Sequence, residues 1–163
     1  MSKVRAVIAM GSNLGDRGEH LQAAAQEVGA INHVKVVALS KVVESYAVTP
    51  AGVDQSKPKY LNAVLLVDTS LKPKELLGEL QAIENKHGRV RVEKWGSRTL
   101  DLDIVDYDHQ VKVGKTLTLP HPRAYQRAFV LAPWAQVDPA AILPGHGSVA
   151  ELAADLKEEV WFI

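Results

Sequence analysis

The order of six apolar segments restricts the fold of this chain more than any other feature of its sequence. Apolar runs rich in β-branched residues indicate strands, and apolar residues three or four apart indicate helices. The segments are a strand at 4–10, a helix at 16–28, a β-rich stretch at 34–48, a strand at 60–69, a helix from 73 to about 87 and a strand at 100–106. This order predicts an α+β fold, a ferredoxin-like α/β sandwich with an antiparallel sheet and helices packed on its faces.

Two long loops and a C-terminal segment complete the predicted organisation. Loops as long as 49–59 and 88–97 are often functional, and we expect them to hold the site on one side of the fold. Residues 111–119 are expected to continue the sheet, and helices are expected at 123–137 and 149–159. A chain of 163 residues fits one domain, 1–163, in which 138–163 form an extension without an assigned motif.

The composition excludes several classes of function. The chain has no cysteine, which rules out disulfides, thiolate zinc sites and cysteine nucleophiles. It has 19 basic and 19 acidic residues, and this zero net charge argues against nucleic-acid or membrane binding by bulk charge. The N-terminal apolar run stops at Gly11 without a small-residue cleavage site, so we expect a strand and not a signal peptide. We therefore expect a cytoplasmic protein.

Two aspartates alternate with apolar residues in the strand at 100–106. Residues two apart on a strand point the same way, so Asp101 and Asp103 share one face, and Leu100, Leu102 and Ile104 share the other. Adjacent carboxylates repel each other unless a cation lies nearby, and Mg²⁺ prefers such oxygen ligands. The pair therefore indicates a magnesium site, and the alternative is a solvated outer face of an edge strand.

The charge changes sign just before this strand. Residues 86–98 contain five Lys or Arg and one acid, whereas 101–108 contain four aspartates and no base. A basic loop that leads into an acidic strand suits a polyphosphate with its metal ions. The alternative is an ordinary surface on which the two clusters pair with each other.

Other polar and aromatic residues allow two readings each. Trp95, in the basic loop, could close over a flat heterocycle or pack its own loop onto the sheet. Tyr60 and Asn62 share a strand face that suits a planar ring with a hydrogen-bonding edge, although spacing alone favours a half-buried strand face.

Spacing alone favours a structural role for three further residues. Gln81 and Glu84 lie three apart on the helix that begins at 73, which favours a solvated flank. His121 lies between two prolines on a rigid turn, from which it could reach a phosphate, but an isolated histidine is more often structural.

Taken together, these segments resemble the 6-hydroxymethyl-7,8-dihydropterin pyrophosphokinase family over roughly residues 4–137. The resemblance rests on G-S-N-L-G-D at Gly11–Asp16, Y-L-N at Tyr60–Asn62, G-R-V-R at Gly88–Arg91, W-G-S-R-T-L-D-L-D-I at Trp95–Ile104, L-P-H-P-R at Leu119–Arg123 and R-A-F-V-L at Arg127–Leu131. The string R-T-L-D-L-D-I is highly specific.

The resemblance implies a reaction and a set of site residues. Family members transfer the β,γ-pyrophosphoryl group of ATP to the hydroxymethyl of a reduced pterin, release AMP, use two magnesium ions and have a ferredoxin-like fold. By motif match, Asp101 and Asp103 would ligate the ions. Arg89, Arg91 and Arg98 would contact the triphosphate, and Arg127 would assist during the reaction. The pterin would contact Thr49, Pro50, Tyr60, Asn62, Trp95 and Phe129. The nucleotide would contact Leu77, Gln81, Glu84, Arg89, Arg98, Ile104, Thr118 and His121.

The chain departs from the family pattern mainly near the basic loop. Ser97 replaces a common proline, Lys94 replaces an arginine and cannot bind in a bidentate way, and the stretch from 91 to 95 is one residue short. Further on, Thr116 or Lys115 takes a basic position near the adenine, and Pro122 takes the place of a tyrosine.

Two other classes of protein remain as alternatives. One is a non-catalytic ferredoxin-like module that binds a nucleotide, which would not need the acidic pair together with the arginines. The other is a magnesium-dependent phosphohydrolase that uses water as the acceptor and would not need the pocket around Tyr60, Asn62 and Phe129. We expect a monomeric enzyme with small-molecule substrates, ATP and the pterin.

Overall fold

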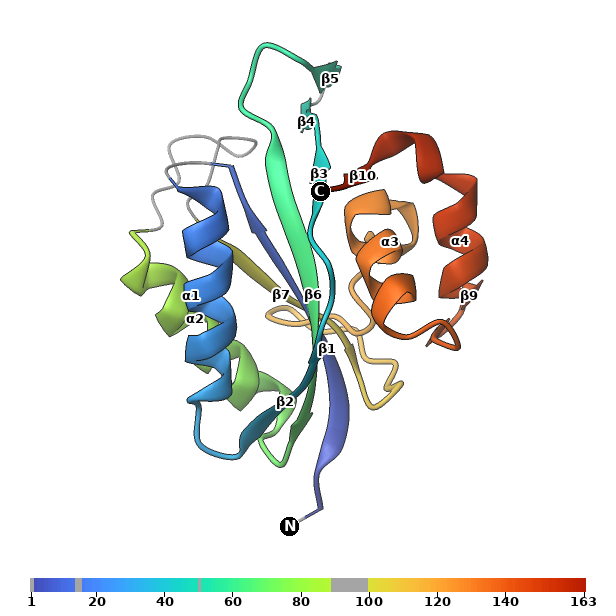
Figure 1. Cartoon of the computed structure of the whole chain (residues 1–163). Helices are drawn as coiled ribbons and strands as arrows, with labels where there is room; N and C mark the ends of the chain where they lie inside the picture. The colour runs from blue at the N-terminus through green and yellow to red at the C-terminus, as the bar shows by residue number, and fades with distance from the viewer. Residues whose placement is uncertain (1, 14–15, 50, 89–99) are drawn as a thin grey trace.

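A twisted antiparallel sheet lies between two layers of helices (Figure 1). The computed structural model describes residues 2–13, 16–49, 51–88 and 100–163, with the side chains of residues 48 and 49 left out. The strands are β1 (Val4–Ser12), β2 (Val34–Leu39), β3 (Val43–Ser45), β4 (Ala47–Thr49), β5 (Gly52–Asp54), β6 (Tyr60–Thr69), β7 (Asp101–Tyr107), β8 (Ile142–Leu143), β9 (Gly147–Ser148) and β10 (Trp161–Phe162). The helices are α1 (Arg17–Gly29), α2 (Pro73–Lys86), α3 (Ala128–Val137) and α4 (Val149–Asp155), with 3-10 turns η1 (Ala124–Gln126) and η2 (Lys157–Glu159).

The strand order confirms the ferredoxin-like prediction. The main sheet runs β10-β3-β6-β1-β7, and β2 also pairs with β6 beyond β3. If β2 and β3 count as one broken strand, the core order is fourth, first, third, second, which is the order of a βαββαβ sandwich. The β-rich stretch predicted at 34–48 is thus divided among β2, β3 and the start of β4.

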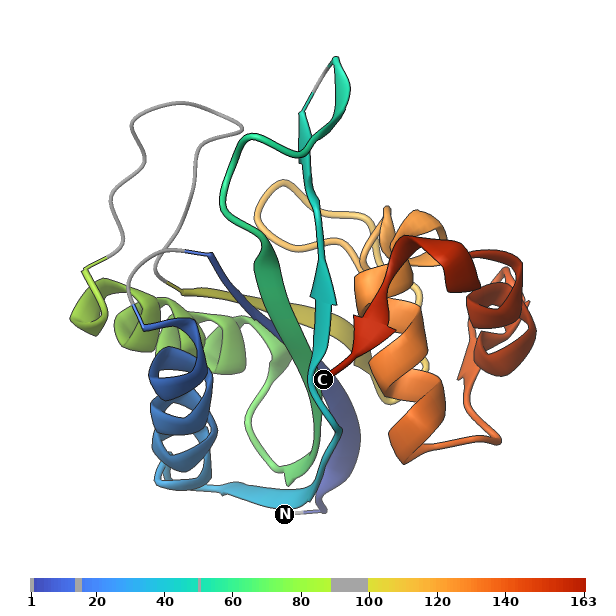
Figure 2. The same cartoon turned by 45° about the horizontal axis from the view of Figure 1, so that its top comes forward.

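Side chains of β1 show how the two faces are covered. Ala6, Ile8 and Met10 point into the core that the sheet forms with α1 and α2, whereas Val7 and Ala9 point into the core formed with α3 and α4. Because successive strand residues point to opposite faces, a continuous apolar run is what a strand buried on both faces requires. Figure 2 shows the two helix layers on either side of the sheet.

The helix ends follow local sequence signals. The Asp16 carboxylate accepts a hydrogen bond from the Glu19 amide at 3.1 Å and so caps the start of α1. The second helix begins with Pro73 at its first position and has Glu75 in its first turn. Both helices pack on the same face of the sheet, where their apolar side chains share one core.

The segment at 138–163 is part of the fold. Its strand β10 pairs with β3, and Ile163 donates a backbone hydrogen bond to Val42 at 3.2 Å. Helix α4 packs against α3, and its Val149 is fully buried. Within the described residues, no helix is both long and apolar enough to cross a membrane.

The prediction for residues 111–119 is wrong. These residues fold back on themselves through one bridge, Lys112 to Leu119, and do not extend the main sheet. The outer edge of β7 already has partners, since the Glu84 side chain accepts from the Leu102 amide and the Val105 carbonyl accepts from the His121 amide. Val113 is correspondingly 87% exposed.

Three other boundaries differ in detail. Loop 49–59 contains the short strand β5, which pairs with β4 in a hairpin that projects at the top of Figure 1. The helix predicted at 123–137 divides into η1 and α3, and the one predicted at 149–159 divides into α4 and η2.

A buried carboxyl lies near the end of β7. Asp106 is 3% exposed, and its Oδ1 atom has no hydrogen-bond partner among the described residues. Its Oδ2 atom lies 3.5 Å from Nδ1 of the exposed His109. Burial raises the pKa of Asp106 above its usual value, and the charge of His109 opposes that shift.

We expect Asp106→Asn to stabilise the fold at neutral pH. A raised pKa in the folded state means that ionisation of Asp106 costs folding free energy once the pH rises above the unfolded value of 3.8. The free energy of unfolding should therefore increase by about 1 kcal/mol at pH 7 and be nearly unchanged at pH 3, where both states are protonated. Urea unfolding at the two pH values measures this, with the exposed Asp155→Asn as control, because Asp155 is not among the charges that shift the pKa of Asp106. Destabilisation at pH 7 would show that the carboxylate is favourably paired.

Candidate active site

Two carboxylates occupy one face of β7. Asp101 and Asp103 are half-buried, whereas Leu102 and Ile104 are buried in the core with α1 and α2. This confirms the alternation predicted from the sequence. Among the residues that the structure describes, no group of three or more His, Cys, Asp or Glu side chains could hold a metal ion. A cation on the two aspartates would therefore take its other ligands from substrate phosphates and water, as Mg²⁺ often does.

A glycine separates this acidic pair from Asn62. Gly11 on β1 lies directly opposite Asn62 on β6 and directly opposite Asp101 on β7. Residues opposite each other in an antiparallel sheet point to the same face, so Asn62 and Asp101 flank Gly11 at about two strand spacings, or about 10 Å. A Cβ atom on Gly11 would lie 2.5 Å from Nδ2 of Asn62. Only glycine leaves room for this amide.

Only one of the two polar atoms of the Asn62 side chain has a hydrogen-bond partner among the described residues. Asn62 is 7% exposed, and its Nδ2 donates to the Met10 carbonyl at 3.3 Å. Its buried Oδ1 atom has no hydrogen-bond partner in the described part of the chain. Because a buried polar atom without a partner is costly, this oxygen suits a ligand N–H group.

The start of α3 brings an arginine to the same face. Arg127 Nη1 lies 4.0 Å from Oδ2 of Asp103, and the guanidinium lies 5.5 Å from the centre of the Phe129 ring. Arg127 and Phe129 are both half-buried. The structure thus places the Arg127 guanidinium beside the acidic pair and an aromatic ring beside that guanidinium.

A cleft of about 250 Å³ opens next to Asp103. Its lining contains four of the residues predicted to contact the nucleotide, which are Leu77, Ile104, Thr118 and His121. Gly114 and Leu117 also line it, but the sequence pattern did not single them out because segment 111–119 looked like a strand. The shape and size of this cleft follow from the fold of that segment, whose Thr118 hydroxyl donates to the Gly114 carbonyl at 3.3 Å.

Glu84 and Gln81 do not line this cleft. Gln81 is exposed, whereas Glu84 is 2% exposed and its Oε2 atom accepts a hydrogen bond from the Leu102 amide at 2.8 Å. Leu102 lies between the two aspartates, so Glu84 holds the strand that carries them. Spacing alone had favoured a solvated flank for Glu84, and that interpretation is wrong.

His121 is a neutral donor in this cleft. Burial, together with the positive charge of Arg127, lowers the pKa of His121 to about 4, although Asp101 opposes the shift. The imidazole is therefore uncharged at neutral pH. Its Nδ1 atom accepts from the Arg123 amide at 3.2 Å, which places the ring hydrogen on Nε2.

Removing this donor should lower catalytic efficiency with a specific pH signature. A hydrogen bond to a charged group contributes about 1.5–3 kcal/mol, so His121→Leu should lower kcat/KM for MgATP about 10–100-fold. His121→Gln keeps an N–H near the same position and should lose less. Because kcat/KM reports the free enzyme, in which the His121 pKa is about 4, the ratio of wild type to His121→Leu should stay constant from pH 8 to pH 5.5. A ratio that grows as the pH falls through 6.5 would show that the charged imidazole is the active form.

The comparisons with known proteins agree with this geometry. The family described as 7,8-dihydro-6-hydroxymethylpterin-pyrophosphokinase (HPPK) matches residues 7–139. The chain belongs to this family. A Haemophilus influenzae protein named 2-amino-4-hydroxy-6-hydroxymethyldihydropteridine pyrophosphokinase is 39% identical over 155 residues, which are 95% of this chain and 94% of that protein. A Bacillus subtilis protein of the same name is 42% identical over 81% of this chain and 77% of its own length.

Solved structures support the fold. The HPPK-DHPS protein of Plasmodium falciparum, crystallised with pterin and p-hydrobenzoate, superposes with a TM-score of 0.73 at 13% identity. The match covers 99% of this chain and 48% of that protein, so the chain spans about half the length of that structure.

Several residues that the HPPK resemblance implicates lie outside the described residues. They are Pro50, Arg89, Arg91, Trp95 and Arg98, together with the side chain of Thr49. Tyr60 is described and half-buried on β6, two residues before Asn62. The described part of the candidate site therefore contains the acidic pair, the cleft beside Asp103, and the three residues Tyr60, Asn62 and Phe129.

A larger cavity lies elsewhere. Its volume is about 560 Å³, and its lining includes Arg17, Glu44, Lys57 and Lys59. None of the predicted site residues lines it. Arg17 donates hydrogen bonds to Glu44 at 3.1 Å and to the Lys59 carbonyl at 2.7 Å. The guanidinium group in this cavity is therefore already bound by other residues of the protein.

Proposed function

We propose that this chain transfers the pyrophosphoryl group of MgATP to the hydroxymethyl group of 6-hydroxymethyl-7,8-dihydropterin. The products are AMP and the pterin pyrophosphate, and the reaction is a step of folate biosynthesis. Membership of the HPPK family supports this activity, as do the names of relatives about 40% identical over most of the chain. The observation that carries the assignment is the single cleft that Asp103 shares with the nucleotide residues Leu77, Ile104, Thr118 and His121.

The donor set of the site fits a divalent cation. Asp101 and Asp103 offer hard oxygen ligands on one strand face, and we propose that they hold two Mg²⁺ ions. When bound, the ions would neutralise charge on the phosphate oxygens of ATP. Arg127, 4.0 Å from Asp103, balances part of the acidic charge. Glu84 keeps the strand in place through the Leu102 amide.

The nucleotide and the pterin have separate places on either side of the acidic pair. The nucleotide would lie in the cleft by β7, where the Nε2–H group of His121 donates to a phosphate oxygen. The pterin would lie above Gly11, where the Oδ1 atom of Asn62 accepts from the N–H edge of the ring and Phe129 and Tyr60 stack on its faces. Such a transfer needs positioning and charge stabilisation more than covalent help.

The remaining site residues follow from the HPPK motifs. Arg89, Arg91 and Arg98 would contact the triphosphate, Thr49, Pro50 and Trp95 would complete the pterin pocket, and Gln81 would approach the nucleotide. We also propose that residues 1–163 act as one pyrophosphokinase domain, and that the protein is a cytoplasmic monomer.

The test is pterin-dependent release of AMP. Protein, MgATP and hydroxymethyldihydropterin are incubated together, and AMP is measured with and without the pterin. We expect AMP only when the pterin is present. AMP that forms equally well without the pterin would favour a phosphohydrolase, and binding of both ligands without AMP would favour a non-catalytic module.

A further inference from the structure

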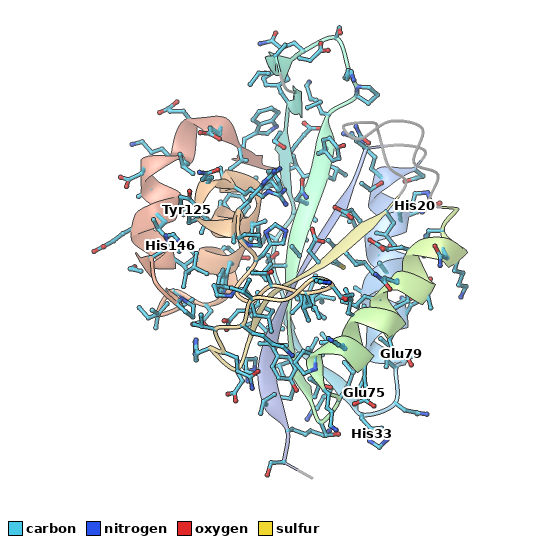
Figure 3. All side chains as sticks on the ribbon, turned by 180° about the vertical axis from the view of Figure 1, so that it is seen from behind. His20, His33, Glu75, Glu79, Tyr125 and His146 are labelled. Atoms are coloured by element: carbon cyan, nitrogen blue, oxygen red, sulfur yellow. The ribbon has the colours of Figure 1, made fainter. Side chains whose placement is uncertain are left out.

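A chain of three side chains links α1 to the end of α2, on the face of the sheet opposite Asp101 and Asp103. His20 Nδ1 lies 2.8 Å from His87 Nδ1, and His87 Nε2 lies 2.8 Å from Oε1 of Glu27. The two imidazole rings meet edge to face, with their centres 5.1 Å apart. In Figure 3, His20 lies on the α1 side of the sheet, away from Tyr125 and His146 on the other side.

The helical spacing explains why His87 fits between its two partners. His20 and Glu27 are seven residues apart on α1, so they share a face and lie about 10 Å apart along the helix axis. The His87 side chain is only 10% exposed and spans the distance with both ring nitrogens. Lys86 Nζ lies 3.6 Å from Oε2 of Glu27 and is the other described charge that faces this group.

The hydrogen bonds determine where the ring hydrogens lie. The Glu27 carboxylate can only accept, so Nε2 of His87 carries a hydrogen and donates it. In a neutral His87 the Nδ1 atom must then accept, and it can accept only if His20 carries its hydrogen on Nδ1. When both rings are neutral, the array therefore has one direction, from His20 through His87 to Glu27, and this direction determines both tautomers.

The array lies where α2 ends. The backbone amide of His87 donates to the carbonyls of Ile83 and Glu84, and the Gly88 amide donates to Asn85. Glu84, one turn earlier, holds the Leu102 amide between the two aspartates. Arg89 follows Gly88 directly in the sequence. The end of α2 thus connects both to the acidic strand and to the start of the arginine segment.

We propose that His20, His87 and Glu27 form a positioning array that fixes the C-terminal end of α2 against α1. Through Glu84 and Gly88, the array positions the metal-binding strand and the chain that leads to Arg89. Its effect on catalysis rests on the proposed pyrophosphokinase function, whereas its hydrogen-bond direction and its effect on α2 do not.

The first test reads the tautomers directly. Long-range nitrogen–proton NMR on the whole ¹⁵N-labelled protein at pH 8 distinguishes Nδ1–H from Nε2–H in each histidine, and the exposed His33 serves as internal reference. We expect His20 as the Nδ1–H form and His87 as the Nε2–H form. A His20 ring with its hydrogen on Nε2 would overturn the array.

The second test reads positioning. His20→Leu removes the donor, His20→Asn keeps an N–H at the δ position, and Gln22→Leu on the exposed face of α1 is the matched control. We expect hydrogen exchange of the His87 and Gly88 amides to accelerate about 10-fold in His20→Leu and to stay near wild type in the other two variants. If all three variants exchange alike, the array does not fix α2.

The third test connects the array to the reaction. Because small misplacements of binding groups lower turnover, His20→Leu should lower kcat by roughly 5-fold while KM for the pterin stays within about twofold, and His20→Asn should restore kcat. If the wild-type protein has no pyrophosphokinase activity, the proposed function is contradicted. The histidine tautomers and the amide exchange rates then still show whether the array exists. Wild-type kcat in His20→Leu, with accelerated exchange, would refute the catalytic part.

Discussion

Asp103→Asn is expected to lower turnover by about 1,000-fold while the fold survives. The substitution keeps the size and polarity of the side chain but removes the charge that would hold a cation beside the nucleotide cleft. The half-buried Asp103 faces Arg127 at 4.0 Å, so the variant also removes the charge attraction between these two side chains. Steady-state assays at saturating MgATP and pterin measure turnover, and circular dichroism monitors the fold.

The comparison needs a variant with the same chemical change close by in the sequence. Asp108→Asn is suitable, because Asp108 is exposed in the turn after β7 and asparagine tolerates its positive φ of 52°. This control should keep wild-type turnover. Activity in Asp103→Asn that matches the control, at any Mg²⁺ concentration, would refute the metal assignment.

Asn62→Leu is expected to abolish most pterin binding without unfolding the protein. The variant removes the buried Oδ1 atom, which has no partner among the described residues, and replaces the side chain with one of similar size. Losing a hydrogen bond in a buried site costs about 1–3 kcal/mol, so the dissociation constant for the pterin should rise about 10–100-fold. The free energy of unfolding should stay the same or rise by about 1 kcal/mol, because an unsatisfied polar atom has been removed.

Calorimetric titration with the pterin and urea unfolding separate the two effects. Asn85→Leu on the exposed side of α2 makes the same change far from the pocket and should leave pterin binding unchanged. An Asn62→Leu protein that binds pterin normally but loses more than about 2 kcal/mol of stability would show that Asn62 is a structural residue.

The sequence predicted those parts of the site that depend on strand alternation. A period of two placed Asp101 and Asp103 on one face and their apolar neighbours in the core, and the structure confirms it. Periodicity could not predict the row from Asn62 across Gly11 to Asp101, because it depends on the register of three strands. Nor could it predict the role of Glu84, which comes from its contact with Leu102, a strand residue 18 positions later in the chain.

Segment 111–119 shows how local pattern fails. Its alternating valines are typical of a strand, but Val111 and Val113 are exposed and the edge of β7 has other partners. The same segment forms a wall of the cleft beside Asp103, so the wrong prediction also hid part of the candidate site. Tertiary contacts, which the local pattern does not report, determine that this segment folds back on itself and does not join the main sheet.

The most direct test of the central claim is the identity of both products. ³¹P NMR of a reaction with MgATP and hydroxymethyldihydropterin should show AMP together with two coupled phosphorus resonances on the pterin, in equal amounts. That result means that the two outer phosphates of ATP move as one group. ADP with a pterin monophosphate, or AMP with free pyrophosphate and unchanged pterin, would contradict the assignment.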